Sequence, residues 1–439
     1  MFKETSKELL EFLSKSPTAF HAVENYRQIL NADGFKELLE SEHWDIVPGG
    51  KYYVTRNNTS ILAFKVGTKL DNYSFNIVTS HTDSPTFKVK ENAEIEVKNK
   101  YTQLNTEGYG GMLCATWLDR PLSIAGRVLV SEGNSIVTKL LNIDRDLLMI
   151  PNVAIHMNRA ANDGFKYNLQ VDMLPLLSAG DDRQKDFKQI IADELGVKKE
   201  DILGHDLYLY NRMAPSIWGA NEEFISSGHL DDLQCGFASL KALLAGYNDE
   251  SIDIMACFDN EEVGSGTKQG ADSTLLRDTL IRINNALGKT EEDYHRALAS
   301  SFMLSADNAH AVHPNHPEHT DVTNCTYMNE GVVVKSHAGQ KYTSDGVSMA
   351  VVKSLASGAD VPLQYFANRS DKAGGSTLGN IAMAQASMNA VDIGLPQLAM
   401  HSSYETAGIK DTYYAISLMK ALFDSHIQET STHSLEIKR

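Results

Sequence analysis

The second half of the sequence alternates short apolar runs with amphipathic stretches, and this alternation restricts the folds that are open to the chain. Runs of strand length begin near residues 252, 302, 332 and 363. The stretches between and after them have the length and apolar spacing of helices, at 232–247, 275–298, 347–357 and 411–423. The alternation predicts an α/β fold with a mostly parallel mixed sheet flanked by helices, whose functional sites lie beyond the carboxyl ends of the strands.

The beginning of the chain fits the same sheet, whereas the middle has a different texture. Two helices are expected within 3–35, and strand-like runs follow at 52–54, 60–66 and 74–79. The middle consists of short alternating segments separated by glycine and polar turns, with one helix near 186–195. We therefore predict an α/β domain built from 1–90 and 222–439, with a β-rich insertion at 91–221. The tail after Ser425 is expected to be loose.

Composition excludes several classes of function. The 439 residues carry a formal charge of −17, which argues against a surface that neutralises nucleic-acid phosphates, so we expect no DNA or RNA partner. No run of about 18 uncharged apolar residues occurs and the N-terminus has the pattern of an amphipathic helix, so no membrane span or secretion signal is expected. The four cysteines show no Cys-x-x-Cys pairing, which is typical of a reducing compartment. A cytoplasmic location is the resulting prediction.

Two segments at the ends of expected secondary-structure elements combine metal-ligating residue types. His81 and Asp83 follow a strand, and a carboxylate two residues on lies on the same side of an extended chain, where it can orient an imidazole that ligates zinc. Asp231 and Asp232 open a helix, where one of them could instead be an N-cap. Alone, each segment also fits a polar surface loop or a helix cap.

A third segment holds two adjacent glutamates, Glu261 and Glu262, directly after a buried strand. The glycines that follow indicate that the backbone approaches something closely, which is unusual for a solvated charge run. In metal hydrolases neighbouring carboxylates divide the work, because one binds the metal and the other takes a proton from the attacking water. The pair predicts such a division, with an exposed acidic loop as the alternative.

The remaining segments add two candidate ligands. Asp307 follows an apolar strand, and His401 precedes the last helix with Glu405 nearby. Mixed histidine and carboxylate ligation suits Zn, Co or Mn, and two such ions about 3.5–4 Å apart, bridged by one aspartate, are used in aminopeptidases. Three further histidines fit a metal site or a polar loop equally well, namely His313, His316 and His319.

Five ordered segments resemble the aspartyl aminopeptidase family of zinc peptidases: HTDSP, HLDDLQCGF, FDNEEVGSGTKQGA, SADNAHAVHPN and MHSSYETAG. The likeness runs from the N-terminal helices to the last one. It implies a metalloaminopeptidase that acts on peptides with a free N-terminus, prefers Asp or Glu there, and holds two zinc ions per subunit, with Co²⁺ or Mn²⁺ as possible substitutes.

The resemblance also implies roles for the candidate residues. Glu261 would be the general base and Asp83 would orient His81. The metal ligands would be His81 and Asp307 for one zinc, Glu262 and His401 for the other, and Asp231 as the bridge.

One further residue comes only from the resemblance. His156, in the β-rich insertion, would ligate metal or reach the substrate in the site of a neighbouring subunit, and the alternative is a buried structural histidine. The insertion would be a dimerisation and lid domain, and the dimers would assemble into a dodecamer.

An acidic substrate side chain needs a cation or a cluster of backbone N–H groups. The candidates for this role are Lys335, Lys341, Tyr342, Gly375 and Ser376. Either lysine could instead be solvated at the surface.

Three other functions remain open at this stage. An N-acyl amino acid deacylase or a carboxypeptidase could use the same fold, and neither needs a free amine. A non-catalytic assembly or cargo-binding protein is a third alternative. Retention of Glu261 beside every implied ligand favours catalysis, because a binding module has no need of a base.

Overall fold

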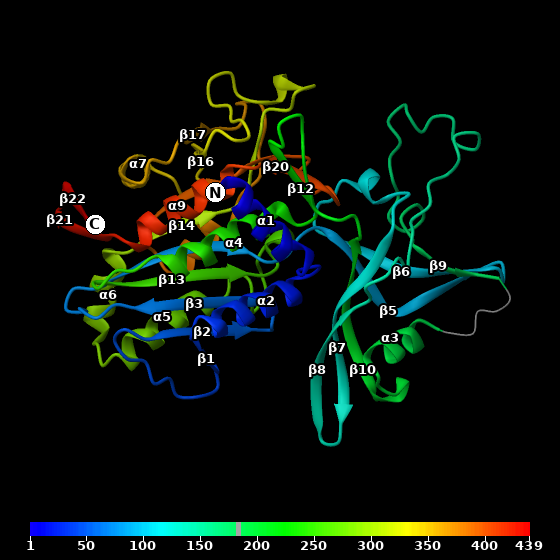
Figure 1. Cartoon of the computed structure of the whole chain (residues 1–439), viewed down its shortest axis with the longest axis horizontal. Helices are drawn as coiled ribbons and strands as arrows, with labels where there is room; N and C mark the ends of the chain where they lie inside the picture. Colours follow the sequence, from blue (N-terminus) through cyan, green and yellow to red (C-terminus); the bar gives the residue numbers. More distant parts are fainter. Residues whose placement is uncertain (181–185) are drawn as a thin grey trace.

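A nine-stranded sheet forms the centre of the computed structural model, which describes residues 1–180 and 186–439 (Figure 1). Its strands lie in the order β1-β2-β3-β13-β4-β14-β18-β16-β17. Parallel pairing joins β13, β4, β14 and β18 in the middle of the sheet, and β3 and β16 pair antiparallel with this group on either side. The predicted mostly parallel mixed sheet is confirmed. The bounds are β1 (Lys36–Leu38), β2 (Lys51–Arg56), β3 (Ser60–Val66), β4 (Ser74–His81), β13 (Ser251–Phe258), β14 (Phe302–Ala306), β16 (Val332–Lys335), β17 (Leu363–Phe366) and β18 (Asn389–Gly394).

Helices cover both faces of this sheet, so its central strands are buried on both sides. Along β13, Met255 and Cys257 enter one hydrophobic cluster, whereas Ile254 and Ala256 enter the other. One face packs against α1 (Phe2–Ser14), α2 (Ala19–Ala32), α4 (Leu230–Ala245), α7 (Gly346–Gly358) and α9 (Asp411–Phe423). The other packs against α5 (Leu275–Ala286), α6 (Glu291–Ala299) and α8 (Leu378–Gln385).

Two parts of the α/β region differ from the sequence prediction. Strand β18 was not predicted from the sequence, and it carries Asp392 within its short apolar run. In the fold this carboxylate is buried and accepts hydrogen bonds from Ser305 and Thr343. The prediction of a loose tail after Ser425 is wrong, because β21 (His426–Ser431) and β22 (Ser434–Lys438) pair as a hairpin whose Ile427 is buried in the core.

A second, antiparallel sheet of six strands lies beside the first (Figure 1). It has its own hydrophobic cluster, and α3 (Phe187–Leu195) packs against it, which confirms the helix that was predicted in this region. The first strand of this sheet begins at Thr86, a few residues after β4 ends. Its strands are β5 (Thr86–Val97), β6 (Tyr101–Tyr109), β7 (Leu122–Glu132), β8 (Ser135–Asn142), β9 (Leu176–Ala179) and β10 (Ile202–Asn211).

A third sheet of five short strands brings distant parts of the chain to one place beside α4. It contains β11 (Ser216–Trp218), β12 (Phe224–Ser227), β20 (Glu405–Gly408), β19 (Pro396–Leu398) and β15 (Ala309–His310), in that spatial order. Short 3₁₀ turns complete the fold at η1 (Cys114–Trp117), η2 (Lys199–Asp201), η3 (Glu261–Val263) and η4 (Pro317–His319). Among the helices described, none has the length and hydropathy needed to cross a bilayer.

Candidate metal centre

The carboxyl ends of the central strands and the five-stranded sheet together bring the predicted metal ligands into one site. His81 is the last residue of β4 and lies beside Phe258, the last residue of β13. Asp307 directly follows β14, as expected for a ligand at the end of a parallel strand. The other candidates come from turns beside these strands: Asp231 from the start of α4, Glu261 and Glu262 from η3, and His401 from the turn between β19 and β20.

Two groups of possible metal ligands share Asp231. One group is His81, Asp231 and Asp307, and the other is Asp231, Glu262 and His401, with the ligand atoms of each group within 4.8 Å of one another. The Nε2 atom of His401 lies 3.5 Å from Oδ2 of Asp231 and 3.3 Å from Oε1 of Glu262. On the other side of the same carboxylate, Nε2 of His81 lies 3.6 Å from Oδ1 of Asp231.

The geometry and the charge of these groups fit zinc. Zinc bonds of 2.0–2.1 Å to nitrogen and oxygen place neighbouring tetrahedral ligands about 3.3 Å apart, close to the separations found here. Oδ1 of Asp231 and Oε1 of Glu262 are buried and accept no hydrogen bond from any residue that the structure describes. A buried charge is costly unless it is paired or bound to a metal, so these two oxygens without hydrogen-bond partners indicate that cations bind here.

Burial and mutual repulsion perturb the carboxylates of the site. Burial, together with the charges of Asp307 and Asp83, raises the pKa of Glu261 to about 7. Burial and the charge of Asp231 raise the pKa of Glu262 well above its ordinary value. Burial acts in the same direction on Asp231, but the neighbouring imidazoles of His401 and His81 hold the pKa of its carboxyl well below its usual range.

Asp83 contacts both His81 and the η3 turn that carries Glu261 and Glu262. Its carbonyl oxygen lies 3.0 Å from Nδ1 of His81, whereas its carboxylate is 3.5 Å from that atom. The carboxylate accepts hydrogen bonds from the backbone N–H groups of Glu261 and Glu262 and from the phenol of Tyr109. It therefore fixes the η3 turn as well as facing His81.

Glu405 supports the opposite end of the site, although the sequence pattern placed it only near His401. It is buried, and its carboxylate accepts hydrogen bonds from the backbone N–H groups of Asp231, at 3.0 Å, and His401, at 2.7 Å. Burial and the charge of Asp231 raise the pKa of Glu405 to about 8. Nδ1 of His401 lies 2.7 Å from the carbonyl oxygen of Gly111, which follows β6, so the six-stranded sheet also reaches this histidine.

The alternative that an aspartate caps α4 is wrong. Asp231 and Asp232 have non-helical backbone angles at the start of α4, and Oδ1 of each accepts no hydrogen bond from the described residues, including the backbone of this helix. The carboxylate of Asp232 is instead fully buried and accepts a hydrogen bond from the backbone N–H of His81. The two aspartates therefore contact the candidate metal centre: Asp231 belongs to both ligand groups, and Asp232 binds the backbone of His81.

The candidate substrate residues lie in different environments. Lys335 is buried, which rules out a solvated surface lysine at this position, and its ammonium group donates to the carbonyl of Asn308 and lies 3.5 Å from Oδ1 of Asp307. The same nitrogen lies 5.6 Å above the ring of Tyr342. Lys341 donates to the carbonyls of Ala373 and Gly374 instead. Two further candidates are exposed, Gly375 and Ser376.

His156 lies away from the two ligand groups, in the loop between β8 and β9. It is exposed in the single chain, so the alternative of a buried structural histidine is wrong. The same loop exposes several large apolar side chains, among them Met157 at 85% and Val171 at 68%.

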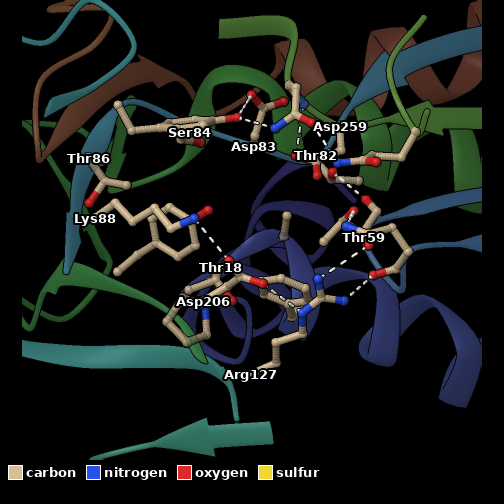
Figure 2. A pocket seen from close by; sticks show the side chains of 18 of the residues that line it. Thr18, Thr59, Thr82, Asp83, Ser84, Thr86, Lys88, Arg127, Asp206 and Asp259 are labelled. Atoms are coloured by element: carbon tan, nitrogen blue, oxygen red, sulfur yellow. Dashed lines mark hydrogen bonds and ion pairs between the residues drawn. The ribbon is translucent and has the colours of Figure 1, made fainter. Parts of the chain in front are cut away.

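A cavity of about 330 Å³ borders Asp83 and lies between the sheets (Figure 2). Its lining includes Asp259 and Tyr109 but, among the residues described, none of the six ligand and base candidates. At its floor, Arg127 of β7 donates to Asp206 and to the carbonyl of Asn57, and its guanidinium stacks on the ring of Phe20. These contacts hold the six-stranded sheet against α2 and the turn between β2 and β3.

Comparison with known proteins places this arrangement in a family. A family model described as aminopeptidase I zinc metalloprotease (M18) matches residues 12–423. A probable M18 family aminopeptidase 2 from Clostridium novyi is 48% identical over 425 residues, which cover 95% of this chain and 98% of the relative. A protein of the same name from Clostridium acetobutylicum is 48% identical over 417 residues, covering 94% and 96%.

Solved structures agree with the sequence comparisons. The cryo-EM structure of a complex of Ape4 and Nbr1 aligns with a TM-score of 0.92 at 35% identity, covering 96% of this chain and 86% of that one. The structure of an S. cerevisiae mApe1 dodecamer aligns with a TM-score of 0.83 at 28% identity, covering 96% and 97%. The chain therefore belongs to the M18 family of zinc metalloproteases and is a zinc-dependent aminopeptidase.

Proposed function

We propose that this protein is a dinuclear zinc aminopeptidase that removes N-terminal residues, with a preference for Asp and Glu, and that Glu261 is its general base. The observation that carries the proposal is the shared position of Asp231 between two ligand groups. His81 and Asp307 would hold one ion, Glu262 and His401 would hold the other, and Asp231 would be shared between them. Co²⁺ or Mn²⁺ would fit the same mixed ligand set.

Glu261 suits the role of base because of its position and its proton affinity. It lies in the same turn as Glu262. One of its carboxylate oxygens lies within 4.8 Å of ligand atoms of His81 and Glu262, so the carboxylate is close to the position proposed for the attacking water. In the metal-free chain, burial and the neighbouring carboxylates raise the pKa of Glu261 to about 7, and the same neighbours favour uptake of a proton from the attacking water.

The reaction divides between the two ions and the side chains. Zinc ions held there would lower the pKa of a water molecule and polarise the peptide carbonyl. Glu261 takes the proton from the attacking water and returns it to the leaving amine. Asp83 keeps Glu261 in position through the backbone of η3. The free α-amino group of the substrate is held by the carboxylates of the site, which restricts cleavage to the first residue.

A preference for acidic residues is supported by Lys335. It is a buried cation beside Asp307 with Tyr342 next to it, so a substrate carboxylate near this place would meet a charge that water screens poorly. With this preference, the proposed substrates are peptides that begin with Asp or Glu, as for an aspartyl aminopeptidase. Lys341, Gly375 and Ser376 are the further candidates for this pocket.

We also propose that the protein is a cytoplasmic homo-oligomer. Residues 91–221 would form the dimerisation and lid domain, and 1–90 with 222–439 the catalytic domain. The related mApe1 from yeast has been solved as a dodecamer, and the exposed apolar side chains around His156 are those expected of a buried interface. In such an assembly His156 would reach a site, most simply that of the neighbouring subunit.

Hydrolysis of Asp-, Glu-, Leu- and Ala-p-nitroanilides tests the proposal, with N-acetylated substrates as controls and with zinc, cobalt or a chelator present. We expect cleavage that requires metal and a free amine and that is fastest for Asp or Glu. Equal rates for all four would leave an aminopeptidase without the acidic preference. Cleavage of the blocked substrates alone would refute the proposal in favour of an acyl amino acid deacylase.

A further inference from the structure

A second group of metal-ligating side chains lies outside the candidate metal centre, in the loop between β15 and β16. His316, Glu318 and His319 each place one ligand atom within 4.8 Å of the others. All three side chains are exposed, and none belongs to the two groups that share Asp231. The loop is part of the yellow-green to yellow region that rises above β16 and β17 in Figure 1.

The spacing within this group suits one ion. Nδ1 of His316 and Oε1 of Glu318 form a hydrogen bond of 3.1 Å, and an ion can take the place of the proton between them because two ligands on a tetrahedral zinc ion lie about 3.3 Å apart. The rings of His316 and His319 are stacked with their centroids 5.4 Å apart. Each imidazole and the carboxylate therefore offers one ligand atom within a span that a single divalent cation could bridge.

The backbone holds these side chains on a single turn. His319 donates its N–H to the carbonyl of His316, Thr320 donates to that of Pro317, and Pro317 itself fixes the first backbone angle of η4. Arg369, from beyond β17, donates to the carbonyl of Glu318 and ties the turn to the body of the protein. An ion would thus bind a turn that is already formed.

His313 is close to the group but differs from it in chemistry. Its ring centroid lies 5.4 Å from that of His316, yet its Nδ1 already accepts a hydrogen bond from the N–H of Asn315. A neutral imidazole that accepts at Nδ1 carries its proton on Nε2, so neither nitrogen is free to ligate a metal without breaking a contact or losing that proton. His313 is therefore a natural control.

We propose that His316, Glu318 and His319 form a third metal site, which takes Zn²⁺ or another divalent ion that prefers imidazole, such as Ni²⁺ or Cu²⁺. Two imidazole nitrogens and one carboxylate oxygen are a ligand set that such ions favour, and water completes the coordination. His319 also lines a cavity of about 250 Å³ together with His310 and Met400, so the ion would lie at the edge of that cavity. The site is independent of the catalytic role proposed above.

Equilibrium dialysis of the full-length protein against rising Zn²⁺, with the bound metal counted by mass spectrometry, tests the site. We expect one more ion per chain in the unmodified protein than in His316→Ala or His319→Ala. Since the loss of an outer-shell partner alone weakens metal binding 10–100-fold, loss of a ligand should weaken this ion on the order of 100-fold. His313→Ala should keep the additional ion.

A second readout identifies the ligands. Cu²⁺ added to protein whose catalytic ions are in place should give an electron paramagnetic resonance signal with coupling to two nitrogens. His316→Ala and His319→Ala should lose one coupling, and His313→Ala should keep both. Equal stoichiometry in the unmodified protein and His316→Ala, or loss of the ion in His313→Ala, would overturn the proposal. Neither result would alter the hydrolysis assay that tests the proposed function.

Discussion

The phenol of Tyr109 donates a hydrogen bond of 2.6 Å to Oδ2 of Asp83. Tyr109 ends β6 in the six-stranded sheet, whereas Asp83 follows β4 in the central sheet. The same phenol oxygen accepts a hydrogen bond from Asn260, which precedes η3. One side chain from the inserted region thus supports both the carboxylate and the turn that carry the proposed base.

Tyr109→Phe removes this support without leaving a cavity. We expect kcat to fall roughly 10-fold, because a hydrogen bond to a charged group contributes about 1.5–3 kcal/mol, while zinc content stays unchanged. The matched control is Tyr208→Phe, since that ring packs on Tyr109 at 5.7 Å and its hydroxyl makes no hydrogen bond within the described part of the chain. An equal loss in both variants would mean that only packing matters.

Glu261→Gln keeps the shape of the side chain but removes the proposed base. We expect kcat to fall roughly 100-fold or more, with the fold and the bound zinc retained, because general base catalysis supplies about 10²–10⁴ of the rate. Turnover numbers and metal content of the same preparation measure both effects. Substantial residual activity in zinc-loaded protein would contradict the role of Glu261.

Metal removal should make stability depend on pH in one direction. The raised pKa values of Glu261, about 7, and Glu405, about 8, mean that the folded chain retains protons that the unfolded chain has released above pH 4.5. Stability is then lost as the pH rises through those values. Burial lowers the pKa of His401, but the neighbouring carboxylates of Asp231 and Glu262 raise it overall to about 10, so its contribution, fully present below pH 6.5, is lost as the pH rises toward 10.

Thermal unfolding between about pH 6 and 9 checks this expectation. Chelator-treated protein should lose melting temperature as the pH rises, whereas zinc-loaded protein should not, since bound cations favour deprotonated ligands. A melting temperature of the metal-free protein that is constant or rises with pH would contradict the assignment of these groups.

Replacing the buried lysine tests the acidic preference. Lys335→Met should lower kcat/KM for Asp-p-nitroanilide at least about 10-fold while leaving the Leu substrate much less affected, because only the acidic side chain loses a partner. Lys341→Met, whose ammonium group is engaged by two backbone carbonyls, serves as the comparison. If both substrates suffer equally in Lys335→Met, the lysine acts through Asp307 and the metal.

Mixed oligomers test whether His156 acts on a neighbouring subunit. His156→Ala and Glu261→Gln should each be nearly inactive alone. Subunits mixed after dissociation should recover activity, because one site in each mixed pair then has both residues. Lack of recovery, in a mixture shown by native mass spectrometry to contain both chains, would place His156 outside the neighbour's site.

Local sequence was sufficient to predict the central strands and the site residues that directly follow them. The strands before His81, Glu261 and Asp307 are buried on both faces, and a ligand at the carboxyl end of a parallel strand can be predicted without knowledge of distant contacts. The ligand groups predicted from these motifs do lie within reach of one another. The overall α/β sheet followed from the same alternation.

Residues that act through distant partners could not be found in this way. Glu405 matters because it accepts hydrogen bonds from Asp231, which is 174 positions away, and the role of Tyr109 depends on the docking of one sheet against another. Strand β18 was not predicted, and its Asp392 is compatible with a sheet interior because buried hydroxyl groups and a backbone N–H donate to its carboxylate.

The turn between β19 and β20 supplies His401 from the last tenth of the chain, while His81 lies in its first fifth. During synthesis, the chain therefore cannot complete its second ligand group until nearly all of it has been made. With His401 as a zinc ligand, as proposed above, a growing polypeptide would lack peptidase activity, and the free N-termini of nearby nascent chains would not be cleaved by it until translation is almost finished.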